Sequence, residues 1–484
     1  MAIGPTLGTG LFIGSGQALA AGGPASLLGS YIFISVLIYC ITTAVAEVAT
    51  HLPSKHGTML SHNYQYTSSH LGFSLGYLRW YSLAMLVPFE ITNAMVNVGL
   101  WDPGLRVAVR VSIVTAVILG FNLLPERVFK RSESAFTAVK LVTIIGLMVI
   151  SICFAAKIFP DSTMQGFQYW SEPGAMSEYL VNGHLGRLLG LLQCILCSTV
   201  SFIFSPELIV QRAEQKDAEC ASSILRVSSI DCVHLSSLYI LSSLAITVAC
   251  PSDEPLLTNN GIGSGLSPYI VGIRRSGIPV LPTIVTVLVF LSSVASGRSF
   301  LFTSSRILCS LAETGHGPRV FKLRNGYGVP YMAVMITALF SGFAFLSVAI
   351  SSTVVFNLLM YFITTSGYIS WLCSSIVYFH FRRTTAAQGF TPAIQARIQP
   401  YGVYVGIAIC SLLVLANALL AIAPSWLVAR NSIPVYVAMF VFLLLYFGHL
   451  LKSTIARKQQ PLNMFRTQGR DDIREKRTSG LESQ

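Results

Sequence analysis

Long apolar runs, separated by short polar segments, extend along almost the whole chain. A helix needs about 20 mainly apolar residues to cross a bilayer core of about 30 Å, and about twelve runs approach that length. We expect membrane helices over residues 2–22, 25–50, 72–100, 107–124, 135–156, 187–210, 229–250, 282–311, 330–350, 354–380, 402–422 and 433–451. The pattern predicts an all-α polytopic membrane protein with about 12 transmembrane helices.

Composition agrees with this pattern. Of the 484 residues, 53% are hydrophobic and only 11% are charged, against about 25% charged in a typical soluble domain. The net charge is +12, but the basic residues are scattered through short loops and the tail. Membrane lipid is therefore the expected surrounding, and nucleic acid is not an expected partner.

The charges of the loops predict an orientation. Basic residues gather at 127–131, 212–216, 319–324 and 382–383 and in the tail from Lys452 onward, which all fall on one side of the expected bundle. The positive-inside rule then places both termini in the cytoplasm. We expect one transmembrane domain over residues 1–452, and a polar, disordered cytoplasmic tail over 453–484.

Four glycines interrupt the first span, in "GTGLFIGSG", at positions 8, 10, 14 and 16. Glycine weakens a helix and lets another backbone or a ligand approach closely. One interpretation is tight helix packing, since Gly10 and Gly14 form a GxxxG pattern. The other is a discontinuous helix whose freed N–H groups bind an anionic group of a substrate.

The sixth span, "STVSFIFSPELIVQRAE", supplies the partner interruption that the second interpretation requires. Pro206 lacks an N–H and clashes with the carbonyl of Phe202, and Glu207 follows where a carboxyl group is costly and indicates a functional site. An ordinary proline kink, with Glu207 near the interface, is the alternative. Together the two interruptions would offer donors for a carboxylate and carbonyls for an ammonium group, which is the polar head of an amino acid.

Three further charged residues lie within spans. Glu90 follows Pro88 in mid-span, Glu47 lies near the inner end of the second span, and Lys140 comes early in the fifth. Lys140 either extends from a helix end to the interface or is buried near carboxylates, where it changes protonation during a transport cycle.

The chain resembles fungal amino-acid permeases of the amino acid–polyamine–organocation superfamily, in the yeast amino acid transporter family. The resemblance runs from about Thr6 to about Leu450. The matching segments are, in order, "GTGLFIGSG", "AGGPASLL", "AEVATHLP", "LGFSLGY", "PFE", "FTAVKLVTIIGL", "GFQYWSEPGA", "GIPVLP", "SSRILCSLAETG", "GVPYMAVM" and "ISWLCSSIVYFHFRR" with "QG". Each segment is weak alone, but their order and spacing are specific.

This resemblance implies a LeuT-like fold of two inverted five-helix repeats, at about 2–156 and 187–382, plus two further helices at about 402–451. In similar transporters, a glycine turn in the first helix holds the substrate carboxylate, while carbonyls and aromatic side chains of the broken sixth helix hold the amino group and gate the site. The matching substrate-binding positions here are Gly8, Thr9, Gly10, Phe202, Phe204 and Ser205.

The resemblance also implies coupling to protons. Lys140 matches a fifth-helix lysine that occupies the place of a sodium ion in proton-coupled relatives. The candidates for proton coupling are Glu90, Lys140, Glu207 and Glu47, and the sequence does not decide which carboxylate carries the proton.

Two departures from the family pattern concern the site. Ser205 and Pro206 replace Gly-Thr in the sixth helix, which predicts a narrower pocket. Arg298 replaces an asparagine in the eighth helix, at a depth where an arginine needs a partner or water. One hypothesis pairs Arg298 with an acidic side chain, either of a substrate or of Glu207, and so gives it a role in selectivity. The other extends it to the cytoplasmic interface beside Arg306.

The leading interpretation is a secondary active transporter that imports amino acids by alternating access with protons as the coupling ion. Broad recognition of neutral amino acids is the default expectation. An amino-acid sensor with little transport, or a non-functional permease paralogue, are the alternatives. No membrane histidine cluster, nucleophile motif or cofactor loop is evident, so we expect no enzyme, cofactor or metal site. The plasma membrane is the expected location, and no pattern indicates an oligomeric state.

Overall fold

The computed structural model describes residues 10–51, 69–101, 104–156, 167–203, 205–216, 221–258, 267–275, 280–389, 395–422 and 434–454. Within these ranges the regular structure is entirely helical, and nine helices are long and apolar enough to cross a membrane. The longer helices are α2 (Ser15–His51), α4 (Ser69–Trp101), α5 (Val107–Leu123), α6 (Glu126–Ala155), α7 (His184–Phe202), α8 (Ser205–Lys216), α9 (Ala221–Ala249), α12 (Leu281–Glu313), α15 (Ser352–Ala387), α16 (Tyr401–Ile422) and the helix Pro434–Thr454.

Shorter elements connect and complete these helices. They are the π-helical turns η1 (Gly10–Gly14) and η2 (Trp170–Gly174), α10 (Pro255–Thr258), α11 (Pro268–Arg275), the 3-10 turn η4 (Arg319–Lys322), α13 (Tyr331–Ala338), the 3-10 segment η5 (Leu339–Phe345) and α14 (Leu346–Ala349). The segments α13, η5 and α14 follow one another without a gap and together form a single membrane-length helix.

Each span expected from the apolar pattern falls on a helix. The first two share η1 and α2, the sixth is divided between α7 and α8, and the last is the helix Pro434–Thr454. The fifth helix begins at Glu126, nine residues before the expected start at 135, because an amphipathic turn with Glu126 and Lys130 precedes the apolar run. The division into two repeats stays a prediction.

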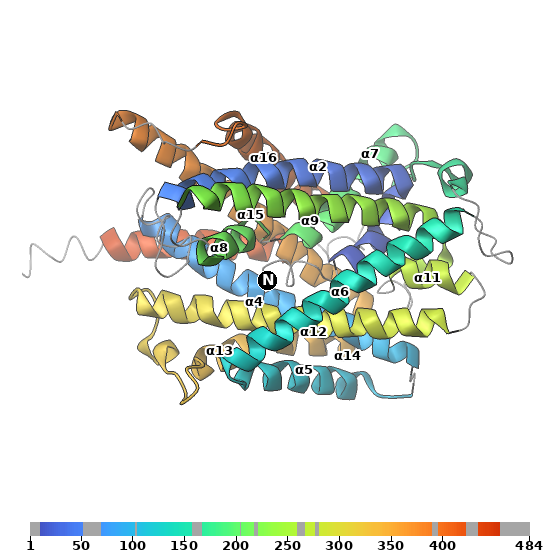
Figure 1. Ribbon diagram of the computed structural model, residues 1–484, viewed down its shortest axis with the longest axis horizontal. Coiled ribbons are helices and arrows are strands. Elements are labelled where there is room, and N and C mark those ends of the chain that lie inside the picture. Colours follow the sequence, from blue (N-terminus) through green and yellow to red (C-terminus); the bar gives the residue numbers. More distant parts are fainter. Residues whose placement is uncertain are drawn as a thin grey trace, which may run out of the picture.

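Two groups of helices form the bundle (Figure 1). The helix α2 packs along α7 and α9, and α4 packs along α12. Figure 1 shows α6 running obliquely across the direction of its neighbours, and it contacts both α9 and α12. Because α6 touches helices of both groups, side chains on its inner face can reach groups that are distant in the sequence.

The residues of α6 show why it sits in this position. Its outward face carries apolar side chains such as Val142 and Ile152, which are 69% and 64% exposed within the isolated chain. Its inward face carries Glu133, Lys140 and Leu147, all buried. These positions are seven residues apart, or about two turns, so they share one face. Apolar groups thus point toward lipid and charged groups toward the protein.

A kink divides α2 into the two predicted spans. Gly23 has φ 79° and ψ 177° inside α2 and is followed by Pro24, in a region of backbone space that only glycine occupies readily. The backbone groups beside the kink bond to the segment before α7: Ser177 N donates to Gly22 O at 3.0 Å, and Ala25 N donates to Ala175 O at 2.9 Å. These hydrogen bonds hold the kink against the segment that precedes α7.

We predict that Gly23→Ala destabilises the protein by about 1–3 kcal/mol, the usual cost of a disfavoured backbone conformation. The added Cβ would also lie 2.9 Å from Ser177 N. Gly146→Ala is the matched control, since Gly146 has open space around it in α6. Thermal unfolding of both purified variants in detergent tests this, and equal melting temperatures for the two variants would contradict it.

Candidate functional site

The sixth membrane span is interrupted, as the sequence predicted. The helix α7 ends at Phe202, Ile203 has a non-helical ψ of 130°, and α8 begins at Ser205. Pro206 is the second residue of α8, where a missing N–H leaves no helical bond unmade. Phe204 lies outside the described residues. The chain thus has a break between α7 and α8 inside a membrane span.

The first span meets this break directly. A Cβ added at Gly10 would lie 2.6 Å from the backbone N of Ser201 and 2.7 Å from its Cα, so the two backbones are in contact. Gly8 and Thr9 lie outside the described residues, and the substrate-binding role expected for them stays a prediction. The contact at Gly10 brings the glycine segment to the end of α7, next to the break.

Aromatic side chains surround the end of α7. The rings of Phe202 and Tyr239 pack edge to face, with centroids 4.8 Å apart, and Tyr31 lies 6.1 Å from Phe202. Tyr239 donates a hydrogen bond to the Ser201 carbonyl at 3.1 Å, and the Tyr31 hydroxyl shares one with Ser201 Oγ at 3.1 Å. Sequence reasoning missed Tyr31 and Tyr239, which come from α2 and α9 and carry no motif of their own.

Ser205 has a buried hydroxyl at the start of α8. Its side chain is fully buried, and among the described residues Ser205 Oγ has no hydrogen-bond partner. Buried polar groups are nearly always hydrogen-bonded. An unsatisfied hydroxyl beside a helix break therefore marks a place where a polar ligand group would be stabilised.

Charged side chains form ion pairs between the helices. Arg79 of α4 donates to Glu207 Oε1 at 3.1 Å, and Ser370 of α15 donates to the same oxygen at 3.2 Å. Glu47 of α2 lies 3.5 Å from Arg382 of α15. The sequence analysis did not single out Arg79, although a charged residue within an apolar span could have indicated it. Each pair joins helices that are distant in the sequence.

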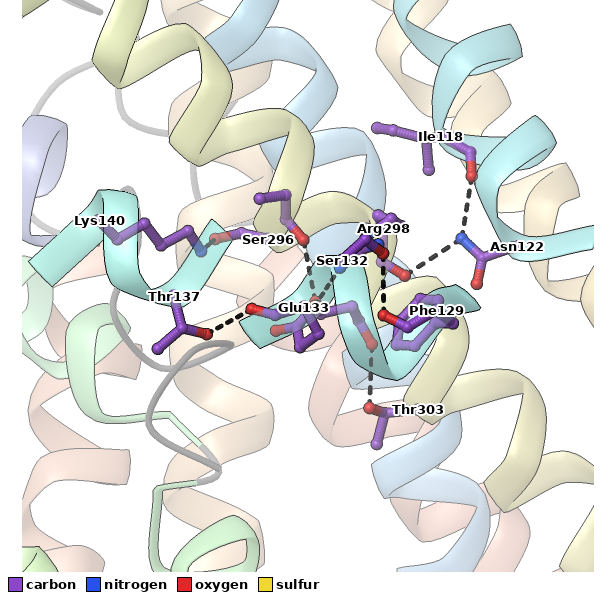
Figure 2. Close-up of polar contacts among 12 residues, drawn as sticks. Ile118, Asn122, Phe129, Ser132, Glu133, Thr137, Lys140, Ser296, Arg298 and Thr303 are labelled. Carbon is purple, nitrogen blue, oxygen red and sulfur yellow. Dashed lines mark hydrogen bonds and ion pairs between the residues drawn. The ribbon is translucent and has the colours of Figure 1, made fainter. Parts of the chain in front are cut away.

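A third pair lies between α6 and α12 (Figure 2). Arg298 donates through Nη2 to Glu133 Oε2 and through Nη1 to Ser132 Oγ. Ser299 donates to the same Glu133 oxygen at 2.7 Å. The guanidinium also lies over aromatic rings, 4.3 Å from the centroid of Phe129. The Arg298 and Glu133 side chains are only 1% and 10% exposed, so this pair is desolvated.

Lys140 lies beside this pair. Its Nζ donates to Ser296 Oγ of α12 at 2.6 Å, and Figure 2 shows Lys140 and Ser296 on the same side of α6 as Glu133. The charged groups that act on Lys140 are Glu133, Glu90 and Arg298. Glu90 is buried in α4 and packs against α12. A Cβ added at Gly297 of α12 would lie 3.2 Å from the Cβ of Glu90.

The comparisons with known proteins agree with this architecture. The family model described as amino acid permease matches residues 1–461. This chain belongs to the amino acid permease family. A probable proline-specific permease of Schizosaccharomyces pombe is 33% identical over 92% of this chain and 82% of its own length. A proline-specific permease of Emericella nidulans is also 33% identical, over 98% of this chain and 87% of its own length.

Two more distant proteins are also similar to this chain, one in sequence and one in fold. A dicarboxylic amino acid permease of Saccharomyces cerevisiae is 29% identical over 94% of the permease described here and 77% of its own length. A solved structure of an Eremococcus coleocola manganese transporter mutant superposes with a TM-score of 0.58 at 14% identity, covering 93% of both chains. This likeness shows the fold alone, which is that of a membrane transporter.

The structure corrects two expectations about the charged residues of the permease. Arg298 neither extends to the interface nor pairs with Glu207, because it is buried against Glu133 while Glu207 is paired with Arg79. The alternative in which Lys140 extends from a helix end to the membrane interface is wrong as well, since the residue is only 3% exposed. Glu133 was missed because it precedes the apolar run, although it lies seven residues before Lys140, a spacing that places both on one helix face.

We predict that Gly10→Ala reduces substrate uptake by the permease at least about tenfold, a loss of roughly 1.4 kcal/mol, because the new Cβ must displace the Ser201 backbone. Uptake of labelled amino acids in permease-deficient yeast, normalised to protein at the cell surface, measures the effect. Gly29→Ala on α2 is the control, since nothing lies within 4 Å of that position. Wild-type uptake by Gly10→Ala would contradict the proposed role of this contact.

Proposed function

We propose that this permease imports neutral amino acids, with proline as the first candidate, in symport with protons and by alternating access. The observation that carries the proposal is the contact between Gly10 and Ser201 at the break between α7 and α8. In this arrangement, N–H groups of the glycine segment at positions 8–10 bind the substrate carboxylate. Carbonyls at the end of α7 and Ser205 Oγ bind its amino group.

The substrate class rests on two arguments. Relatives that are 32–33% identical over most of this chain are named as proline-specific permeases. In addition, Arg298 is already neutralised by Glu133, so it offers no free cation to an acidic side chain. The aromatic rings of Tyr31, Phe202 and Tyr239 supply an apolar wall for a compact neutral substrate.

Proton coupling is supported by the buried charges. Ionisable groups inside membrane spans commonly form proton relays. Lys140 shares the buried face of α6 with Glu133, and Glu90 is buried in α4. Glu207 and Glu47 are held by Arg79 and Arg382, so we assign the coupling proton to the region of Lys140 and Glu90. The proposed location is the plasma membrane, with both termini in the cytoplasm.

We predict that labelled proline uptake in permease-deficient yeast rises at acidic external pH and collapses with a protonophore. An excess of unlabelled proline should compete fully, and an excess of glutamate should not. Lys140→Met, which removes the buried amino group on which the charges of Glu90 and Glu133 act, should abolish the pH dependence while the protein still reaches the cell surface.

The same assay separates the alternatives. Uptake that is unchanged by the protonophore would overturn proton symport but would still support amino-acid transport. No uptake of any amino acid by protein shown at the cell surface would instead support a sensor or a non-functional paralogue, and substrate binding by the purified protein would then distinguish these two.

A further inference from the structure

Four buried charged residues form one group between α4, α6 and α12. Glu90, Glu133, Lys140 and Arg298 are all buried, with at most 8% of the whole residue exposed, backbone included. With two acids and two bases, the group is neutral when all four residues are ionised. Inside a protein a unit charge acts on its neighbours far more strongly than in water, so the charge of each member biases the protonation of the others.

Arg298 and Glu133 are bound to each other, whereas Lys140 reaches a hydroxyl. Glu133 Oε2 accepts hydrogen bonds from both Arg298 and Ser299. Lys140 Nζ donates to Ser296 Oγ, which lies on the same face of α12 as Ser299, three positions further on. The guanidinium of Arg298 is held by its hydrogen-bond partners. It does not lose a proton itself, because arginine stays charged in proteins. It acts as a fixed charge beside a group that can titrate.

We infer that the Arg298–Glu133 ion pair sets the protonation of Lys140, and thereby the pH range over which the permease transports its substrate. Both members of the pair are positioning residues in this scheme, because they act through Lys140. The inference deepens the proposed function and rests on its proton coupling. The charged groups that act on Lys140 are Glu133 on its own helix, Glu90 on α4 and Arg298 on α12.

The charge balance gives the sign of each effect. Replacing Arg298 by asparagine leaves Glu133 without its cation, so the extra negative charge favours the protonated form of any neighbouring group. Replacing Glu133 by glutamine leaves Arg298 without its anion, which favours the deprotonated form. Replacing both removes one charge of each sign and restores the neutral balance. A purely structural ion pair would give no such opposite signs.

Uptake of labelled proline against external pH tests the inference in yeast expressing the full chain. Relative to wild type, we expect the half-maximal pH of uptake to move up by roughly one unit in Arg298→Asn and down by a similar amount in Glu133→Gln. The double variant Arg298→Asn/Glu133→Gln should return close to the wild-type midpoint, and Arg298→Lys should stay near it.

Arg306→Asn is the matched control. It removes the same charge from the same helix, but Arg306 lies eight residues, or about two turns, beyond Arg298 on α12. Its guanidinium lies over the ring of Phe302. Its midpoint should not move. Shifts of the same sign in Arg298→Asn and Glu133→Gln, or no shift in either, would overturn the inference while protonophore-sensitive uptake by wild type preserves the proposed function.

Two further outcomes are decisive. If Glu133→Gln exchanges proline but no longer accumulates it, Glu133 itself carries the proton and its positioning role is refuted. If wild-type uptake is insensitive to the protonophore, the proposed coupling fails, and the pH dependence of the melting temperature of the purified variants tests the inference instead. Opposite shifts of that pH profile in Arg298→Asn and Glu133→Gln would support it, and coincident profiles would refute it.

Discussion

Charged side chains inside a membrane bundle must be neutralised by one another, and this constraint shapes the centre of the permease. Taking a charge out of water costs several kcal/mol, and leaving one member of a buried pair without its partner costs about 3–5 kcal/mol. The structure meets the constraint with ion pairs between helices that are distant in the sequence: Arg79–Glu207, Glu47–Arg382 and Arg298–Glu133. Each of these pairs joins a helix from the first predicted repeat to one from the second. In the proposed alternating-access mechanism, movement of one repeat against the other would change the surroundings of these charges.

The uncharged part of the site depends on a related constraint, because backbone groups in a membrane need partners as well. The kink at Gly23 meets it through bonds to Ala175 and Ser177. At the break between α7 and α8, Tyr239 donates a hydrogen bond to the Ser201 carbonyl. Ser205 Oγ, at the same break, has no partner among the described residues. In the proposed function, this buried hydroxyl beside the interruption is one of the groups that bind the substrate.

Much of the fold could be predicted from the sequence because lipid imposes a simple length and polarity rule on each helix. The order of the spans, the division at Gly23–Pro24 and the interruption near Pro206 all follow from local composition, and the helices confirm them. The family assignment also followed from the ordered segments and is confirmed over residues 1–461. The prediction was least accurate at helix ends. At α6, for example, the polar segment that contains Glu133 lies outside the apolar run but inside the helix.

The sequence by itself determined which residues are costly to bury, namely Glu47, Glu90, Lys140, Glu207 and Arg298, because that cost depends on residue type and on position in an apolar run. It could not determine which charges neutralise which. A pairing depends on the relative rotation and crossing of helices that are more than a hundred residues apart, as Glu133 and Arg298 are. Only the tertiary structure decided that Arg298 belongs to Glu133 rather than to Glu207 or to the interface. The physical reason is that a charge in a low-dielectric interior is stabilised by the nearest opposite charge in space, which the helix packing selects.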